Sequence, residues 1–237
     1  MARLVLISDI HANLPAFEAI LIELESINYD EIICLGDVVG YGPHPSECIN
    51  IIQSMGIKCV KGNHDAGVTG ELTERHFRNP NRKLIQITKN LLSANDIDWL
   101  KNLPLTIESK DDSYMAVHAS PIQPKNWEYL ESAIRIRSIL KDFNYRFCFV
   151  GHTHIQAFVS NQFGGKVICN DGKYLINPGS IGQSRDRDYR ASYCVLDTVQ
   201  NEYNFHRVDY NLENVVNDLE MMGFNRKDAE HLMRIST

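Results

Sequence analysis

The sequence has no basic block, no closely spaced cysteine pair and no long apolar run, and each absence excludes a class of protein. Among its 237 residues, 24 Lys and Arg stand against 30 Asp and Glu, a net charge of −6. Tight electrostatic binding to a nucleic-acid backbone is therefore not indicated, and nucleic acid is an unlikely partner. The most basic stretch, SRDRDYR over residues 184–190, alternates arginine with aspartate.

The six cysteines are far apart, with no CxxC pair, and four of them lie inside apolar, strand-like runs, namely Cys34, Cys59, Cys148 and Cys194. Thiols in such positions are typical of small buried residues in a reducing cell interior. The chain starts with the strand-like MARLVLISDIH, without a signal-peptide pattern, and no apolar run approaches the length of a membrane span. We therefore expect a cytoplasmic protein without a membrane partner.

Hydrophobic residues make up 43% of the chain and charged residues 23%, as in an ordinary globular protein. There are no repeats, low-complexity tracts or linker-like stretches, so we expect one domain over residues 1–237. The pattern specifies no oligomeric state.

Apolar runs and helical periodicity alternate through the first sixty residues. RLVLIS, EIICLGD and IKCVKGN are short apolar runs typical of buried strands, and LPAFEAILIELES and PSECINIIQSMG between them have helical spacing. This β-α-β-α-β order predicts a parallel sheet with right-handed crossovers.

The middle of the chain, about residues 66–104, is polar and helical in pattern, and it could form a lid or a wall over a binding site. LTIES and YMAVHAS then predict strands, and a helix around LESAIRIRSILKDF leads into the strand RFCFV. IQAFVS, KVICN, YLINPGS, ASYCVLDT and NEYNFHRVDY predict short, antiparallel strands separated by turns, and two helices close the chain at residues 212–222 and 226–234.

Polar side chains interrupt the apolar pattern at one kind of place, the carboxyl ends of predicted strands. SDIH follows the first strand, GD the second, GNHD the third, VHAS a later strand and GHTH the last one before the antiparallel segment. Open α/β sheets bind their ligands at this edge. A single histidine there is more often an ordinary buried residue, but five of the chain's nine histidines belong to this set. The set comprises Asp9, His11, Asp37, Asn63, His64, Asp65, His118, His152 and His154.

Imidazole and carboxylate groups without thiolates suit divalent Mn, Fe, Zn or Ni better than a structural cysteine–zinc site. Seven candidate ligands are too many for one ion with open positions, but they fit two ions that share a bridging carboxylate. Two ions about 3.5–4 Å apart can clamp a phosphoryl group and activate water as a hydroxide nucleophile. The sequence therefore predicts a dinuclear metal site, with manganese as the first candidate.

The motifs DIH, GDVVGYG, GNHD, VHAS and GHTH, in this order, resemble the five blocks of the calcineurin-like metallophosphoesterases. NPGSIGQSRDRDYRASYCVLD, residues 177–197, is similar to the compact prokaryotic phosphodiesterase branch of that family. The resemblance covers most of the chain. It implies the metallophosphoesterase fold, an α/β (α+β) sandwich of two mixed sheets flanked by helices.

The resemblance also implies roles for the residues in these blocks. Asp9, His11 and His154 would bind one metal, Asn63, His118 and His152 would bind the second, and Asp37 would bridge the two. His64 would face the phosphate, where it would protonate the leaving oxygen or stabilise charge, and Asp65 would orient the His64 imidazole. Family members of the Ser/Thr protein phosphatase and symmetrical dinucleoside-tetraphosphatase types carry an arginine just after GD, which contacts phosphate. GDVVGYG has Val and Tyr in that neighbourhood, so protein phosphatase activity is disfavoured.

Four further residues are candidates for contact with a small phosphorylated substrate. Asn13 could contact a phosphate oxygen or instead cap the following helix. Tyr41 could line the pocket or simply form a turn. Ser180 and Arg185 flank a Pro-Gly turn, and Arg185 could pair with phosphate or with a surface carboxylate.

Three functions remain compatible with these features. The first is a phosphoesterase that hydrolyses a phosphodiester, or a phosphomonoester, of a small molecule such as a nucleotide or dinucleoside polyphosphate. The second is a nuclease, which the acidic balance disfavours. The third is a non-catalytic binding scaffold with this fold, which has no need of the complete ligand set or of His64.

Overall fold

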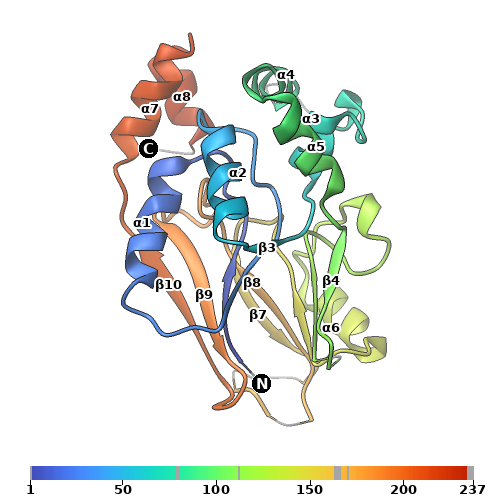
Figure 1. The fold of residues 1–237 in the computed structure, drawn as a ribbon. Helices are drawn as coiled ribbons and strands as arrows, with labels where there is room; N and C mark the ends of the chain where they lie inside the picture. The colour runs from blue at the N-terminus through green and yellow to red at the C-terminus, as the bar shows by residue number, and fades with distance from the viewer. Residues whose placement is uncertain (1, 78–80, 112, 163–166, 170, 234–237) are drawn as a thin grey trace.

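The computed structural model describes residues 2–77, 81–111, 113–162, 167–169 and 171–233. Within these ranges the strands form two five-stranded sheets, in the orders β10-β9-β1-β2-β3 and β4-β5-β6-β8-β7. The sheets pack face to face and helices flank them (Figure 1). The predicted sandwich of two mixed sheets is therefore confirmed.

The first sheet is built on the predicted parallel unit. β1 (Arg3–Ile7) pairs in parallel with β2 (Glu31–Cys34), which pairs in parallel with β3 (Lys58–Cys59), and the crossovers are α1 (Leu14–Leu24) and α2 (Pro45–Ser54). β9 (Ala191–Asp197) then joins β1 on its other side in antiparallel orientation, and β10 (Glu202–Val208) pairs with β9. The last strands of the chain thus complete the sheet that its first strand began.

The second sheet mixes both orientations. β5 (Tyr114–Val117), β6 (Phe147–Phe149) and β8 (Tyr174–Pro178) run parallel to one another. β4 (Thr106–Glu108) and β7 (Gln156–Ser160) are antiparallel edge strands. The helix before β6 is α6 (Ala133–Asp142).

Alternation along the strands divides the apolar core into three layers. Leu4 and Leu6 of β1 point between the sheets, where they meet Phe149 and Ile176 of the second sheet. Val5 of β1 points the other way, against α1 and α2. On the far side α6 covers the second sheet. Burial on both faces explains why these strands are continuous apolar runs.

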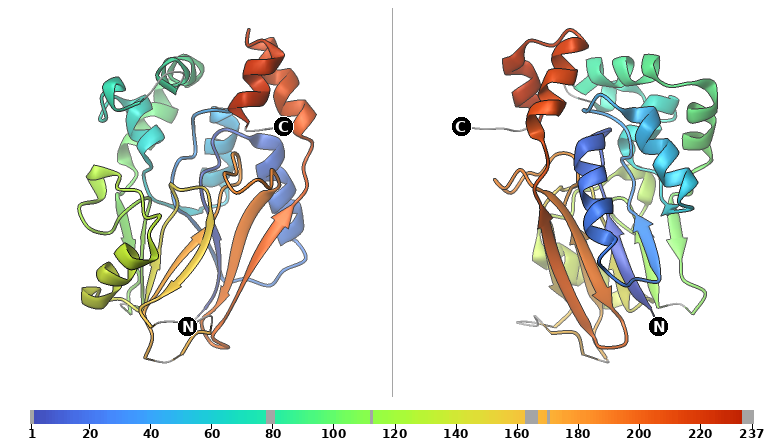
Figure 2. Two further views of the ribbon diagram at one scale, coloured as in Figure 1. Left: turned by 180° about the vertical axis from the view of Figure 1, so that it is seen from behind. Right: turned by 60° about the vertical axis from the view of Figure 1, so that its left-hand side comes forward.

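The remaining helices lie beyond the carboxyl ends of the parallel strands. α3 (Asn63–Thr69), a 3₁₀ turn (Glu74–His76), α4 (Asn81–Leu91) and α5 (Ala94–Asn102) form one group, and α7 (Leu212–Met221) and α8 (Arg226–Leu232) form another. Figures 1 and 2 show the two groups on either side of the strand ends. A further 3₁₀ turn, η2 (Pro124–Asn126), lies in the loop after β5. The middle of the chain is helical, as predicted.

One predicted strand is wrong. In KVICN, residues 167–169 form no strand, while residues 166 and 170 lie outside the described ranges. Ile168 is nevertheless buried in the core between the sheets, so its apolar character reflects packing of a loop residue.

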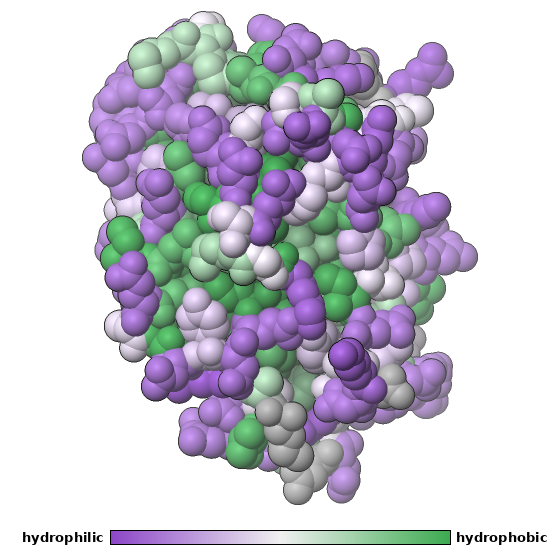
Figure 3. Space-filling view, in the orientation of Figure 1, coloured by the Kyte–Doolittle hydropathy of each residue, from purple (hydrophilic) through white to green (hydrophobic). Residues whose placement is uncertain are grey.

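On the surface drawn in Figure 3, apolar residues appear between polar ones in the middle of the face. No helix in the described ranges is both long and apolar enough to cross a bilayer.

Candidate metal centre

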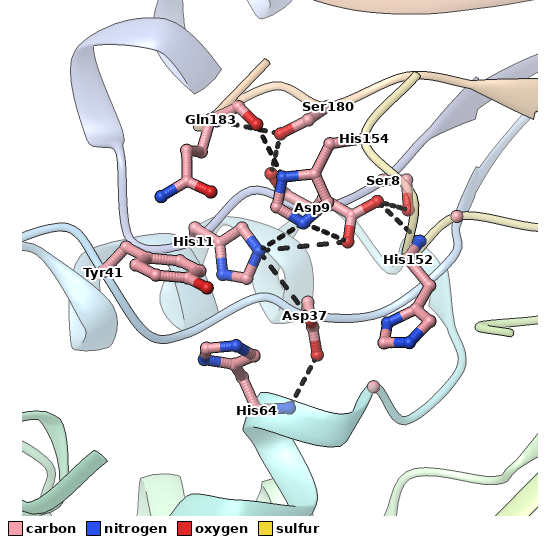
Figure 4. Close-up of polar contacts among 12 residues, drawn as sticks. Ser8, Asp9, His11, Asp37, Tyr41, His64, His152, His154, Ser180 and Gln183 are labelled. Atoms are coloured by element: carbon pink, nitrogen blue, oxygen red, sulfur yellow. Dashed lines mark hydrogen bonds and ion pairs between the residues drawn. The ribbon is translucent and has the colours of Figure 1, made fainter. Parts of the chain in front are cut away.

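The loops after β1, β2, β3, β5 and β6 bring their polar side chains into one cluster. Figure 4 shows the part of it around Asp9, His11 and Asp37. The first sheet contributes both aspartates of the cluster, Asp9 and Asp37, together with His11 and Asn63. The second sheet contributes His118, His152 and His154. Side chains from positions 9 to 154 therefore meet at one edge, as the strand-end pattern predicted.

The cluster consists of two groups that share Asp37. In the inner group, one ligand atom each of Asp9, His11, Asp37 and His154 lie within 4.8 Å of one another, and in the outer group the same holds for Asp37, His118 and His152. One oxygen of Asp37, Oδ2, lies 3.7 Å from His11 Nε2 and 3.3 Å from His118 Nε2.

Asn63 belongs beside the outer group. Its Oδ1 lies 3.1 Å from His118 Nε2, which in turn lies 3.2 Å from His152 Nδ1. All seven predicted ligands are thus brought together, in the two sets that the resemblance implies.

Backbone carbonyls fix which ring nitrogen of each histidine faces the cluster. His11 Nδ1 lies 3.1 Å from the Val39 oxygen, His118 Nδ1 lies 2.7 Å from the Leu35 oxygen, and His154 Nδ1 bonds the Gln183 oxygen. A carbonyl can only accept, so each Nδ1 carries a proton, and in the neutral imidazole each Nε2 presents a lone pair. His152 is reversed, since its Nε2 lies 3.1 Å from the Trp127 oxygen and its Nδ1 faces His118.

The arrangement of the ring nitrogens and carboxylate oxygens fits a bound cation. In the inner group His11 Nε2 and His154 Nε2 are 3.1 Å apart, and neither has a hydrogen to donate in the neutral form that its carbonyl contact specifies. Asp9 Oδ1, 3.4 Å from His154 Nε2, is buried and has no hydrogen-bond partner among the described residues. Lone pairs aimed at one another in a buried cluster favour a divalent metal between them.

Burial and neighbouring charges shift the pKa values of the cluster residues. Burial raises the pKa of Asp9 to about 7, and the neighbouring charge of Asp37 adds to the effect. Burial lowers the pKa of His11 and of His154 well below the usual range, and lowers that of His152 to about 3. For His118 the loss of hydration is outweighed by Asp37, to which it also hydrogen-bonds, and the pKa rises to about 10.

The ligand-bearing loops have an unusual backbone. Asp9, His11, Asp37, His152 and His154 all have positive φ, between 50° and 66°. This left-handed region is uncommon for residues with a side chain, and it is maintained only where the surrounding structure enforces it. In Asp9 the carboxylate itself contributes to this constraint, because Oδ2 accepts from Ser8 Oγ at 2.7 Å and from the His152 amide at 3.0 Å.

Close approach of the loops requires glycine at two positions. A Cβ at Gly62 would lie 2.0 Å from Asp37 Oδ1, and a Cβ at Gly151 would lie 1.9 Å from Ser8 Oγ. Gly62 of GNHD therefore lets the loops after β3 and β2 approach within the first sheet, and Gly151 of GHTH lets the end of β6 approach the end of β1 in the other sheet.

His64 stands beside the shared ligand. Its amide donates to Asp37 Oδ1 at 2.8 Å, and its ring lies among His11, Tyr41 and Phe77 at centroid distances of 4.8, 4.7 and 5.3 Å. Burial lowers its pKa to about 4. Its Nδ1 is buried without a hydrogen-bond partner in the described part of the chain. The imidazole is therefore neutral near pH 7.

The predicted role of Asp65 is wrong. Its carboxylate does not orient the His64 ring, because the two oxygens accept from the backbone amides of Asp37, Val38, Val39 and Gly62 at 2.8 to 3.3 Å. Asp65 instead fixes the loop that carries Asp37. Burial and the charge of Asp37 raise the pKa of Asp65 to about 7.

The predicted substrate contacts have different surroundings. Asn13 caps α1, accepting from the Ala16 amide at 3.2 Å and donating to the Gly182 oxygen at 3.0 Å, so the structure shows the capping alternative. Ser180 is fully buried, and its hydroxyl donates to the backbone oxygen of Asp9 at 2.8 Å.

Tyr41 and Arg185 lie beside the inner group. The Tyr41 ring packs edge-on against His11, and its hydroxyl is 3.5 Å from Arg185 Nη2. Arg185 is close enough to Asp9 and to the cluster histidines for their charges to interact, and its buried Nε has no partner among the described residues.

Sequence reasoning missed Trp127, Tyr129 and Gln183. Trp127 and Gln183 act through backbone oxygens, which any residue provides, so their side chains carried no signal. Tyr129 stacks on His152 with a centroid distance of 3.8 Å. An aromatic residue in an irregular loop such as KNWEYLE was the one available clue.

Comparison with known proteins agrees with this geometry. Residues 2–201 match the family model of the calcineurin-like phosphoesterase superfamily domain, and the chain belongs to that superfamily. It is 39% identical over 223 residues to protein MJ0912 of Methanocaldococcus jannaschii, covering 90% of this chain and 89% of that one. The crystal structure of a metallophosphoesterase from Sphaerobacter thermophilus matches with 33% identity and a TM-score of 0.82, covering 97% of this chain and 98% of that one.

A relative with a more specific name is more distant. The symmetrical bis(5'-nucleosyl)-tetraphosphatase of Haemophilus ducreyi is 31% identical over 150 residues, covering 59% of this chain, and the match spans only 53% of the tetraphosphatase. The predicted family and the prediction of a hydrolase of phosphate esters are confirmed.

Proposed function

We propose that the protein is a dinuclear-metal phosphoesterase that hydrolyses a phosphodiester, or a phosphomonoester, of a small molecule such as a nucleotide or dinucleoside polyphosphate. The observation that carries the proposal is the pair of buried donor groups that share one carboxylate oxygen, Asp37 Oδ2. Two such groups around one bridging ligand suit two ions and a phosphoryl group between them.

Asp9, His11, His154 and Asp37 would hold one ion, and Asn63, His118, His152 and Asp37 would hold the other. Manganese is the first candidate, and iron, zinc and nickel accept the same ligands. Divalent cations, when bound, neutralise charge on phosphoryl oxygens and make water acidic enough to attack phosphorus near neutral pH.

The chain's own residues would serve the two ends of the reaction. As the bond from water to phosphorus forms and the ester bond breaks, the leaving oxygen needs a proton or a hydrogen bond. His64 can supply it from a ring N–H, and the negative charge of an incoming phosphate would raise the imidazole pKa from about 4. Arg185, next to Tyr41, would neutralise a non-bridging phosphate oxygen.

The helical segment of about residues 66–104 would form one wall of the pocket. Phe77 packs edge-on against His64, and Leu84 of α4 packs with Tyr41 and with Leu232 of α8. Both helical groups therefore reach the residues that surround the proposed phosphate position.

A nucleotide substrate is supported by the tetraphosphatase relative, although this chain aligns with about half of that protein's length. The net charge of −6 favours a small molecule over a nucleic acid.

Hydrolysis of p-nitrophenyl and bis-p-nitrophenyl phosphate, with Mn²⁺, Fe²⁺, Zn²⁺ or Ni²⁺ added separately, tests the proposal. Asp37→Asn is the matched control. The asparagine side chain keeps an oxygen that can accept from the backbone N–H of His64, but it removes the negative charge that the two metal ions would share. We expect turnover at least about 1000-fold above this control with one or more metals. Equal rates for the two proteins would contradict the proposal and favour the scaffold, whereas cleavage confined to oligonucleotides would favour the nuclease.

A further inference from the structure

Tyr129 lies directly beside the outer metal group and is half exposed. Its ring packs on His152 with a centroid distance of 3.8 Å and an interplanar angle of 30°, and 49% of the residue's surface remains accessible. About half of an aromatic residue that packs on a proposed metal ligand is thus open to solvent.

The loop around Tyr129 holds the ring in place. On one side of it in sequence, the Trp127 oxygen accepts from His152 Nε2 at 3.1 Å, and on the other Leu130 is buried in the core under α6. Glu128 pairs with Arg135 of α6 through two bonds of 2.8 and 3.1 Å. Trp127 has a φ of +52°, a conformation that such anchoring must maintain.

Tyr129 also reaches the proposed phosphate contact. Its hydroxyl is close enough to the guanidinium of Arg185 for the two groups to interact, and the charge of that guanidinium interacts with Asp9. The Tyr129 ring therefore lies near the position where Arg185 would bind a phosphate. A planar group attached to that phosphate could lie against it.

We propose that Tyr129 is a specificity-determining residue, a stacking platform for a planar aromatic substituent of the substrate, such as a nucleobase. The inference rests on the proposed phosphoesterase function and names the substrate feature that the site reads beyond phosphate. A π-face accepts any base, so the platform favours nucleotides as a class without selecting one base.

Two probes that differ only in the base test this platform. Adenosine 5'-monophosphate and ribose 5-phosphate share the phosphate and the ribose, and their dissociation constants from manganese-loaded protein can be measured by calorimetry. We expect the nucleotide to bind about tenfold more tightly than the sugar phosphate. Tyr129→Leu should abolish the difference, and Tyr129→Phe, which keeps the ring but loses the hydroxyl, should retain it.

Tyr189 offers a matched control, since it too is a tyrosine with 49% exposure, and its hydroxyl contacts Asp209 at the surface. Tyr189→Leu should leave the preference unchanged. Equal affinity of wild-type protein for the two probes would overturn the platform, and so would an equal loss for both probes in Tyr129→Leu, which would reduce Tyr129 to a support for His152 and Arg185.

The same protein preparation separates this inference from the function on which it rests. If bis-p-nitrophenyl phosphate is hydrolysed while the base makes no difference, the stacking platform alone is wrong. If a base-dependent affinity is found without any hydrolysis, the platform holds and the proposed catalytic function fails.

Discussion

The inner and outer groups of the cluster contain similar ligands but are held differently. In the inner group, Asp9 and both histidines are almost completely buried, and their positions are fixed by Ser8, Val39 and Gln183. The outer group borders the loop of residues 121–132, which contributes the Trp127 oxygen and the exposed ring of Tyr129. The side chains in both metal-binding groups are buried, but the outer group also depends on a contact from a surface loop. We expect the inner group to bind its metal more tightly and the outer group to exchange it.

Among the residues compared with the two metal-binding groups, His64, which belongs to neither, should have a large effect on turnover. His64→Gln should lower kcat by about 100-fold to 1000-fold, because it removes a proton donor to the reacting oxygens. Metal content, measured by elemental analysis, should stay at the wild-type level, because the His64 contact with Asp37 is made by the backbone amide. A parallel loss of metal would show that His64 acts by maintaining the groups.

A matched pair of substitutions compares the groups directly. His152→Gln should weaken the outer metal by about 10-fold to 100-fold and leave the inner one bound, so that dialysed protein retains about one ion per chain. His11→Gln should disturb the tighter site and leave less metal after the same dialysis. Equal retention in the two variants would remove the distinction between a tight and an exchangeable site.

The pH dependence of metal affinity should sharpen the comparison. The pKa of His118 is raised to about 10, so below that pH a metal entering the outer group must displace a proton. Its affinity should therefore rise as pH rises, by about tenfold between about pH 7.5 and about pH 8.5.

The inner group should respond less over the same interval, because the pKa of each of its histidines is low and that of Asp9 is about 7. Calorimetric titration with Mn²⁺ at several pH values resolves the two events. Two affinities with the same slope against pH would contradict this assignment.

The smallest effect is expected at Arg207 of β10, which holds the loop of residues 184–190. Its guanidinium donates to Ser184 Oγ at 3.3 Å and to the Asp188 oxygen at 3.2 Å, and it pairs with Asp186. Arg207→Gln should loosen the loop that carries Arg185 and raise KM for bis-p-nitrophenyl phosphate by about fivefold, with metal content unchanged.

Arg190→Gln serves as the control, because that arginine pairs with Asp188 in the same loop but is 40% exposed. A KM increase of the same size in both variants would show general loosening of the loop, not a specific function of Arg207. An additive effect of Arg207→Gln and Arg185→Gln would likewise exclude action through Arg185.

Much of the fold followed from local pattern. Continuous apolar runs marked strands that are buried on both faces, and helical spacing between them predicted the parallel unit β1-α1-β2-α2-β3. The rule that ligands lie at the carboxyl ends of such strands also selected the residues that the structure brings together.

The errors have physical causes beyond local sequence. Ile168 is as apolar as a strand residue, but it packs from an irregular segment. The family resemblance implied that Asp65 orients His64, whereas the start of α3 turns its carboxylate toward the amide of Gly62 and three amides of the loop after β2. The left-handed backbone of the ligand loops and the stacking of Tyr129 arise only when distant segments meet.

The histidine anchors have a consequence for how such a centre tolerates mutation. At positions 35, 39, 127 and 183 the atom that holds each imidazole is a main-chain oxygen, which every amino acid possesses. A replacement at any of these positions keeps the proton on the same ring nitrogen, provided that the chain follows the same path. Leu35 and Val39 are fixed by the apolar cores that bury them, whereas Trp127 belongs to the loop beside Tyr129. The side chain of that loop residue can therefore change without altering the protonation on which metal coordination depends.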